Sequence, residues 1–108
     1  MEGEDENWVT VTKRQSVKPG EVLGVTVGEH EIALYNVDGS LYATDNVCTH
    51  AYAQLDQGVL DGDVIECPLH GGQFDVKTGK GLCEPITEDL KIYQVRVVGD
   101  DVQLWVTS

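Results

Sequence analysis

Turn signals interrupt this chain about every ten residues, and that spacing limits what it can fold into. Between the turn signals, Val, Thr, Ile, Leu and Tyr gather in short runs. Asp38-Gly39 and Asp61-Gly62 are strong hairpin signals, because both central residues of such a turn need a positive φ. No window keeps apolar residues at helical spacing for three turns without a glycine. The sequence therefore predicts an all-β protein, a compact antiparallel sandwich or barrel.

The expected strands are the runs between the turn signals. Gly28-Glu29-His30 joins two of them, and Trp8 and Trp105 fall on the strand pattern, where we expect core positions. The predicted strands are residues 8–12, 21–27, 31–37, 41–44, 59–60, 64–65, 91–98 and 102–107.

The length of 108 residues allows one domain and leaves no room for a second core. Residues 1–7 carry four acidic side chains and no apolar residue after Met1, so we expect a flexible acidic tail before a single domain of residues 8–108. Residues from about 45 to 85 hold all three cysteines and six of the twelve glycines. Such a loop-rich stretch usually carries function, so we expect a loop-rich functional insertion on a β base.

The charge balance narrows the partners of the chain. Nineteen acidic residues against seven basic ones give a formal charge of −12. This argues against nucleic acid and anionic membranes, which attract Lys and Arg, and favours a basic protein partner. No apolar run is long enough to span a bilayer, and the first residues do not form a secretory signal, so we expect a cytoplasmic protein.

Three cysteines are too few for a disulfide scaffold and indicate metal ligation with one spare thiol. Cys48-Thr49-His50 is followed, sixteen residues on, by Cys67-Pro68-Leu69-His70. Two thiolates and two imidazoles suit either zinc or an iron–sulfur cluster. Zinc modules usually keep the cysteines in one half of the motif and the histidines in the other. Here each of the two segments, called boxes below, contains one cysteine and one histidine. Facing mixed loops fit two metal atoms, one bound by thiolates and the other by imidazoles.

The two boxes resemble those of the Rieske [2Fe–2S] proteins. Nearly the whole chain resembles the small Rieske ferredoxins of bacterial aromatic-ring dioxygenases. The segments that carry the resemblance are Ala-Leu-Tyr-Asn-Val-Asp-Gly, Asp-Asn-Val-Cys-Thr-His, Glu-Cys-Pro-Leu-His-Gly-Gly-Gln-Phe-Asp and Thr-Gly-Lys-Gly-Leu-Cys-Glu-Pro. The last of these resembles the naphthalene-type branch.

The resemblance implies both a site and a function. It implies one [2Fe–2S] cluster, with Cys48 and Cys67 on the inner iron and His50 and His70 on the outer iron. It implies a monomeric electron carrier, not an enzyme, that takes single electrons from a flavin NAD(P)H-dependent reductase to a terminal oxygenase. Only one histidine is left over, so the chain cannot also build a mononuclear iron site with two histidines. Two alternatives stay open: a small Rieske subunit of another oxidoreductase, such as a nitrite reductase, and a structural zinc-binding β-module.

Departures from the high-potential members of the family bear on the potential. Ala53 and Leu69 stand where those members carry a disulfide between the loops. Gly72 and Phe74 stand where they carry a serine and a tyrosine that donate hydrogen bonds to sulfur. Fewer donors stabilise the reduced cluster less, so we expect a potential near the lower end of the family range, about −150 to +300 mV.

Other residues of the insertion and its surroundings have simpler interpretations. We expect Cys83 to be a buried thiol that packs as a small hydrophobe, and His30 to be a solvated turn residue. A few apolar residues beside the histidines are candidates for a docking rim. They are Ala51, Tyr52, Pro68, Leu69 and Pro85.

Overall fold

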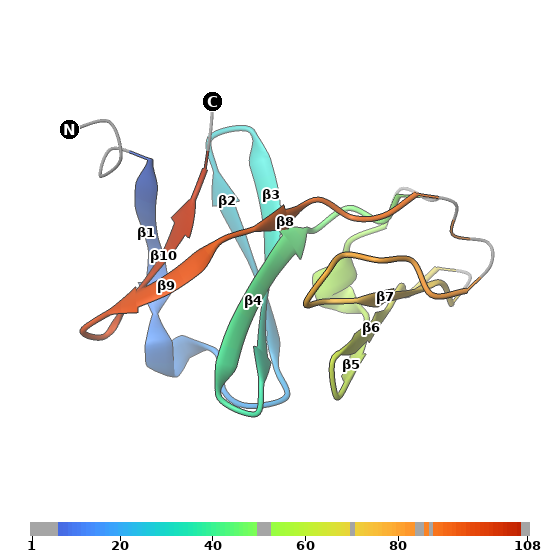
Figure 1. Cartoon of the computed structure of the whole chain (residues 1–108), viewed down its shortest axis with the longest axis horizontal. Coiled ribbons are helices and arrows are strands. Elements are labelled where there is room, and N and C mark those ends of the chain that lie inside the picture. The colour runs from blue at the N-terminus through green and yellow to red at the C-terminus, as the bar shows by residue number, and fades with distance from the viewer. Residues whose placement is uncertain (1–6, 50–52, 70, 84–85, 87, 107–108) are drawn as a thin grey trace.

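The computed structural model describes residues 7–49, 53–69, 71–83, 86 and 88–106 (Figure 1). Within these ranges the helical elements are two short 3-10 turns, η1 (Arg14–Ser16) and η2 (Leu55–Gln57). No helix in these ranges has the length and hydrophobicity that a membrane span needs. Every strand pairing is antiparallel, which confirms the predicted all-β antiparallel fold.

The strands form three sheets (Figure 1). The first has the order β1-β10-β9, from β1 (Trp8–Lys13), β10 (Asp101–Trp105) and β9 (Val95–Val98). The second has the order β2-β3-β4-β8, from β2 (Val22–Val27), β3 (His30–Val37), β4 (Ser40–Asp45) and β8 (Ile92–Tyr93). The third has the order β5-β6-β7, from β5 (Val59–Asp61), β6 (Val64–Glu66) and β7 (Gln73–Asp75).

Strand β3 lies at the centre of the molecule and is buried on both faces. Ile32 and Leu34 pack toward the first sheet, against buried residues of β10, because alternate side chains of a strand point to opposite faces. Ala33 and Tyr35 pack on the other side, against buried residues of the third sheet. The second sheet is therefore the middle layer, and the third sheet covers the face that bears Tyr35.

The hairpin turns follow two patterns. Asp38 and Gly39 have φ values of 54° and 95°, as the Asp-Gly signal predicted. At the third-sheet hairpin, Asp61 pairs with Val64, so the turn residues are Gly62 and Asp63 rather than Asp61 and Gly62. Gly62 has a φ of 63°, which is the conformation that a two-residue turn with glycine at its first central position requires.

Two features of the C-terminal half differ from the prediction. The predicted strand 91–98 breaks at Gln94, because β8 pairs with β4 while β9 pairs with β10. Strand β7 was not predicted, since its three residues lie among glycines. Thr107, the predicted end of the last strand, lies outside the described residues.

The two tryptophans are not core residues, contrary to the prediction. Trp8 and Trp105 are half-buried neighbours on β1 and β10, with ring centroids 5.4 Å apart in an edge arrangement. The Arg96 guanidinium lies 4.2 Å from the Trp8 ring centroid. His30 is half-buried at the start of β3, with its ring edge toward Tyr93, rather than fully solvated. The outer face of the first sheet is therefore an aromatic surface that a cation covers.

Candidate metal centre

Each box cysteine begins a six-residue loop that its own backbone amide closes. The Cys48 N–H donates to the Ala53 carbonyl at 2.9 Å, and the Cys67 N–H donates to the Gly72 carbonyl at 2.7 Å. Paired residues close both loops, Val47 with Gln54 in the first and Glu66 with Gln73 in the second. The two loops are therefore closed in the same way at their described ends, although their sequences differ.

The structure brings the two cysteines together. Both side chains are buried, with 4% of Cys48 and 1% of Cys67 exposed, and both belong to one apolar cluster with Phe74. Burial raises the pKa of the Cys67 thiol, and a hydrogen bond with the Cys48 thiol raises it further. The Leu69 backbone N–H donates to the Cys67 sulfur and opposes this shift in pKa. Metal binding must therefore displace the proton of the buried Cys67 thiol.

The other two predicted ligands, His50 and His70, lie outside the described residues. His50 is the third residue of the first loop, and His70 is the fourth residue of the second. Within the described residues, no group of three or more metal-binding side chains comes together. The site that the structure describes is thus its thiol half.

Asn46 fixes the first loop to the middle sheet, a role that the sequence analysis missed. Its side chain is 4% exposed, and its Oδ1 accepts a hydrogen bond from the Asp56 N–H at 2.9 Å. Its Nδ2 donates to Asp56 Oδ1 at 3.2 Å. Its backbone N–H donates to the Glu31 carbonyl on β3, and its carbonyl accepts from the Leu55 N–H on η2. A polar residue two positions before the first cysteine was the only sequence signal.

Gly58 lets the first loop approach the second. A Cβ atom at this position would collide with the carbonyl oxygen of Glu66, the residue before Cys67. The Gly58 N–H also donates to the Leu55 carbonyl at 2.9 Å and ends η2. Only glycine permits this close packing of η2 against the end of β6.

A third segment, residues 79–90, binds both loops from the outside. The Leu82 N–H donates to the Gln73 carbonyl at 2.8 Å, which extends the third sheet. The Thr49 hydroxyl of the first loop donates to the Glu88 carbonyl at 2.9 Å. Both loops are therefore connected through a segment that follows them in the chain.

The prediction that Cys83 is buried is wrong. Cys83 is exposed, and its thiol donates to Gln73 Oε1 at 4.0 Å. Its neighbour Leu82 is also 44% exposed. Both residues are therefore exposed next to Gln73 of β7 instead of packing in the core.

Part of the predicted docking rim is exposed as expected. Pro68 is exposed, and Leu69 is 43% exposed. Ala51, Tyr52 and Pro85 lie outside the described residues. Leu82, which was not predicted, is a further exposed apolar residue and lies on the segment that pairs with β7.

The positions that depart from the high-potential pattern differ in burial. Phe74 is fully buried beside the two cysteines, and Gly72 is buried at the end of the second loop. Ala53 is half-buried and Leu69 is exposed. The aromatic ring that lies against the thiols therefore carries no hydroxyl to donate toward sulfur.

The donor set suits a thiophilic metal centre, because two buried thiols at hydrogen-bonding distance can bind one metal atom together. The model of one family, the Rieske [2Fe-2S] domain, matches residues 7–94. The chain belongs to the Rieske [2Fe–2S] family. This Rieske chain therefore carries one [2Fe–2S] cluster, and the family excludes the zinc-binding module that the two boxes left open.

The chain is similar to known ferredoxins over most of its own length and of theirs. The chain is 48% identical over 99 residues to the ferredoxin component of the naphthalene 1,2-dioxygenase system of Pseudomonas aeruginosa, covering 92% of this chain and 95% of the relative. The Sphingomonas yanoikuyae B1 ferredoxin has a TM-score of 0.89 at 39% identity, covering 94% of this chain and 100% of that one.

A third relative has been solved with a partner. It belongs to a complex of reduced oxygenase and oxidized ferredoxin in carbazole 1,9a-dioxygenase. Its TM-score is 0.87 at 41% identity, covering 92% of this chain and 93% of that one. The naphthalene and carbazole relatives are ferredoxins of dioxygenase systems, which are electron carriers and not catalytic enzymes, and this Rieske chain is of the same kind.

Proposed function

We propose that this protein is the ferredoxin of a bacterial aromatic-ring-hydroxylating dioxygenase system. It accepts single electrons from a flavin-containing NAD(P)H-dependent reductase and delivers them to the terminal oxygenase. The observation that carries this proposal is the similarity, over nearly the whole length of both chains, to ferredoxin components of such systems. The carrier has no substrate of its own, so its residues must hold the cluster and recognise two proteins.

We propose that Cys48 and Cys67 hold one iron and that His50 and His70 hold the other. The support is the burial of the two thiols at hydrogen-bonding distance and the matching closure of both loops. When bound, the cluster supplies a one-electron couple. The Leu69 N–H that donates to the Cys67 sulfur stabilises negative charge there, which favours the thiolate over the thiol.

We propose that the exposed apolar edge formed by Pro68, Leu69 and Leu82 is part of the docking surface for the redox partners. Leu69 and Leu82 expose 43% and 44% of their surface beside the second loop. Exposed apolar side chains next to a redox centre can exclude water from an interface, which brings the partner close enough for electron transfer.

We also propose how the chain is organised and where it works. Residues 8–108 form a single Rieske domain with a cluster-binding insertion at about 45–85, and residues 1–7 form a tail. The carrier is a cytoplasmic monomer. The charge of −12 supports diffusion as a separate molecule that basic surfaces attract.

Reconstitution tests the proposed function. The iron-loaded protein is mixed with NADH or NADPH, a flavoprotein ferredoxin reductase and the terminal oxygenase of a naphthalene 1,2-dioxygenase system. We expect product formation to require the carrier and to scale with its concentration. Purification from its native cell as a fixed subunit of a large oxidoreductase, with no transfer to the oxygenase, would contradict the proposal.

A further inference from the structure

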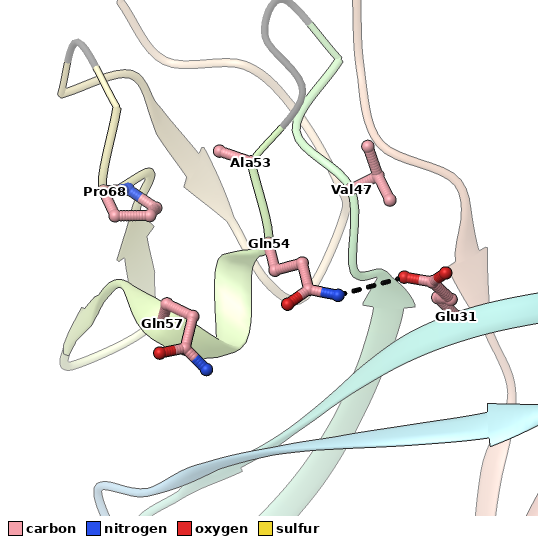
Figure 2. Close-up of a pocket in the computed structure, with 6 residues that line it drawn as sticks. All are labelled: Glu31, Val47, Ala53, Gln54, Gln57 and Pro68. Atoms are coloured by element: carbon pink, nitrogen blue, oxygen red, sulfur yellow. Dashed lines mark hydrogen bonds between the residues drawn. The ribbon is translucent and has the colours of Figure 1, made fainter.

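A hollow opens between the two cluster loops and the start of β3. Its volume is about 330 Å³, and six side chains line it (Figure 2). In Figure 2 the apolar side chains lie along the upper side and the polar ones along the lower side. The six residues are Val47, Ala53, Pro68, Glu31, Gln54 and Gln57.

The position of the hollow relates it to the thiols. Val47 precedes Cys48 in the chain, and Pro68 follows Cys67. A group that fills the hollow therefore contacts residues bonded directly to both cysteines.

The polar side of the hollow consists of one carboxylate, from Glu31, and two amides, from Gln54 and Gln57, whose oxygens can accept hydrogen bonds. Gln54 Nε2 donates to Glu31 Oε1 at 3.2 Å, which orients the amide so that its own oxygen stays available (Figure 2). The Glu31 side chain is exposed. The ion pairs among the described residues join Lys13 to Asp101 and Lys77 to Asp63, and neither involves Glu31.

We propose that this hollow receives an arginine side chain of the terminal oxygenase. The inference rests on the proposed function. The planar guanidinium has five donors in a fixed fork, which matches the Glu31 carboxylate and the oxygens of Gln54 and Gln57. The methylene stem of the arginine packs on the apolar side formed by Val47, Ala53 and Pro68.

The charge of the whole protein favours the same occupant. A chain of net charge −12 attracts a basic surface, and the hollow places one carboxylate where such a surface would meet the cluster loops. A lysine ammonium is a compact and strongly hydrated charge, so it would use fewer of the acceptors.

The first test measures the second-order rate of electron transfer from the reduced, iron-loaded protein to the oxygenase of a naphthalene 1,2-dioxygenase system. Glu31→Gln keeps the size of the side chain and a hydrogen bond to Gln54 but removes the charge. We expect its rate constant to fall about tenfold, and that of Glu31→Lys to fall further. Asp100→Asn is the matched control, because it removes one charge from the β9–β10 turn at the far end of the molecule (Figure 1).

A second measurement identifies the cation. Methylguanidinium chloride should slow transfer by the wild-type protein more than sodium chloride or methylammonium chloride at equal ionic strength. Glu31→Gln should remove this extra inhibition, and the reduction potential should stay unchanged in every variant.

The outcomes separate the two proposals. Absence of transfer by the wild-type protein overturns the proposed function and this inference together. Transfer by the wild-type protein with an equal rate for Glu31→Gln, or an equal loss for Asp100→Asn, overturns the inference alone. Equal competition by methylammonium overturns the assignment to arginine.

Discussion

Asn46 and Asp56 hold each other by two hydrogen bonds across the first cluster loop. The Asp56 backbone N–H donates to Asn46 Oδ1 at 2.9 Å, and Asn46 Nδ2 donates to Asp56 Oδ1 at 3.2 Å. Together with the bonds from the Asn46 backbone to β3 and η2, they fix both ends of the segment that carries Cys48. A buried amide, rather than apolar packing alone, thus sets the position of the first thiol.

Replacement of this amide should weaken both the fold and the cluster. Asn46→Ala leaves the Asp56 N–H without its partner, and we expect the free energy of unfolding to fall by about 1–3 kcal/mol. Asn36→Ala is a matched control, because Asn36 is also buried and bridges the Val17 carbonyl and the Gly39 N–H away from the thiols. Urea unfolding measures stability, and the rate of bleaching in a chelator measures cluster retention. Equal bleaching of both variants would show that Asn46 has no special role at the site.

The proposed ligands have a natural control in the third histidine. Changing His50 or His70 to Ala, or Cys48 or Cys67 to Ser, should abolish or strongly alter the visible absorption and the electron paramagnetic resonance signal of the reduced protein. His30→Ala should leave both spectra unchanged, since His30 at the start of β3 packs against Tyr93 of β8. We expect the loops to lose order without iron while the β base stays folded. An unaltered spectrum in His50→Ala would reject the ligand assignment.

The absence of hydroxyl donors near the cysteine sulfurs should keep the reduction potential of the cluster low. Gly72→Ser with Phe74→Tyr supplies two donors where high-potential relatives carry them. Each bond to sulfur should stabilise the reduced state by about 1–2 kcal/mol, which raises a one-electron potential by about 40–90 mV. Because Phe74 is fully buried, the visible spectrum must first show an intact cluster. Protein-film voltammetry then gives the potential, and a value at or below that of the wild type would mean that backbone donors or solvent set it.

Alkaline pH should destabilise the protein through Tyr35. Burial is the main cause that raises the pKa of this side chain, which is enclosed in the core. The unfolded chain releases the tyrosine proton near pH 10 while the folded chain keeps it, so stability is complete below about pH 10 and falls above it. The loss is about 1.4 kcal/mol per pH unit for one such group.

Tyr35→Phe isolates this contribution. The Thr44 hydroxyl donates its one proton to the Asp45 carbonyl, so it accepts the 2.8 Å hydrogen bond that it shares with Tyr35. Thr44 therefore keeps a hydrogen-bond partner when the Tyr35 hydroxyl is removed. Urea unfolding at about pH 8 and pH 11 should show a smaller loss for Tyr35→Phe than for the wild type. Burial, together with Asp45, also raises the pKa of Tyr93. Both proteins therefore keep the part of the alkaline destabilisation that Tyr93 contributes. Identical pH dependence in the two proteins would refute the assignment.

Local patterns in the sequence were enough to predict most of the strands and one turn. The runs around β2, β3 and β4 are strongly β-prone, and Asp38-Gly39 adopts the two positive φ values that an Asp-Gly turn favours. The boundary at Gln94 could not be predicted, because the pairing partners of β8 and β9 lie far away in the chain. Periodicity reports which residues favour a strand and not which sheet the strand joins.

The same limit applies to the site. The two boxes and the family resemblance that they carry predict four ligands, and the structure describes the two cysteines, which it buries in one cluster. The boxes could not reveal Asn46 or Gly58, whose roles depend on contacts with β3 and with Glu66 across the fold. The exposure of Cys83 also depends on where residues 79–90 cross the loops, which no local pattern encodes.

The three segments around the thiols all lie at one end of a molecule that measures 42 × 28 × 19 Å, away from the β1-β10-β9 sheet (Figure 1). A protein bound at that end covers the route by which an electron both arrives and leaves. Under the proposed function, the reductase and the oxygenase must therefore take turns, and each visit begins only after the previous partner has dissociated. Tight binding to either partner would slow the whole pathway, so selection for flux favours a small interface with a short residence time.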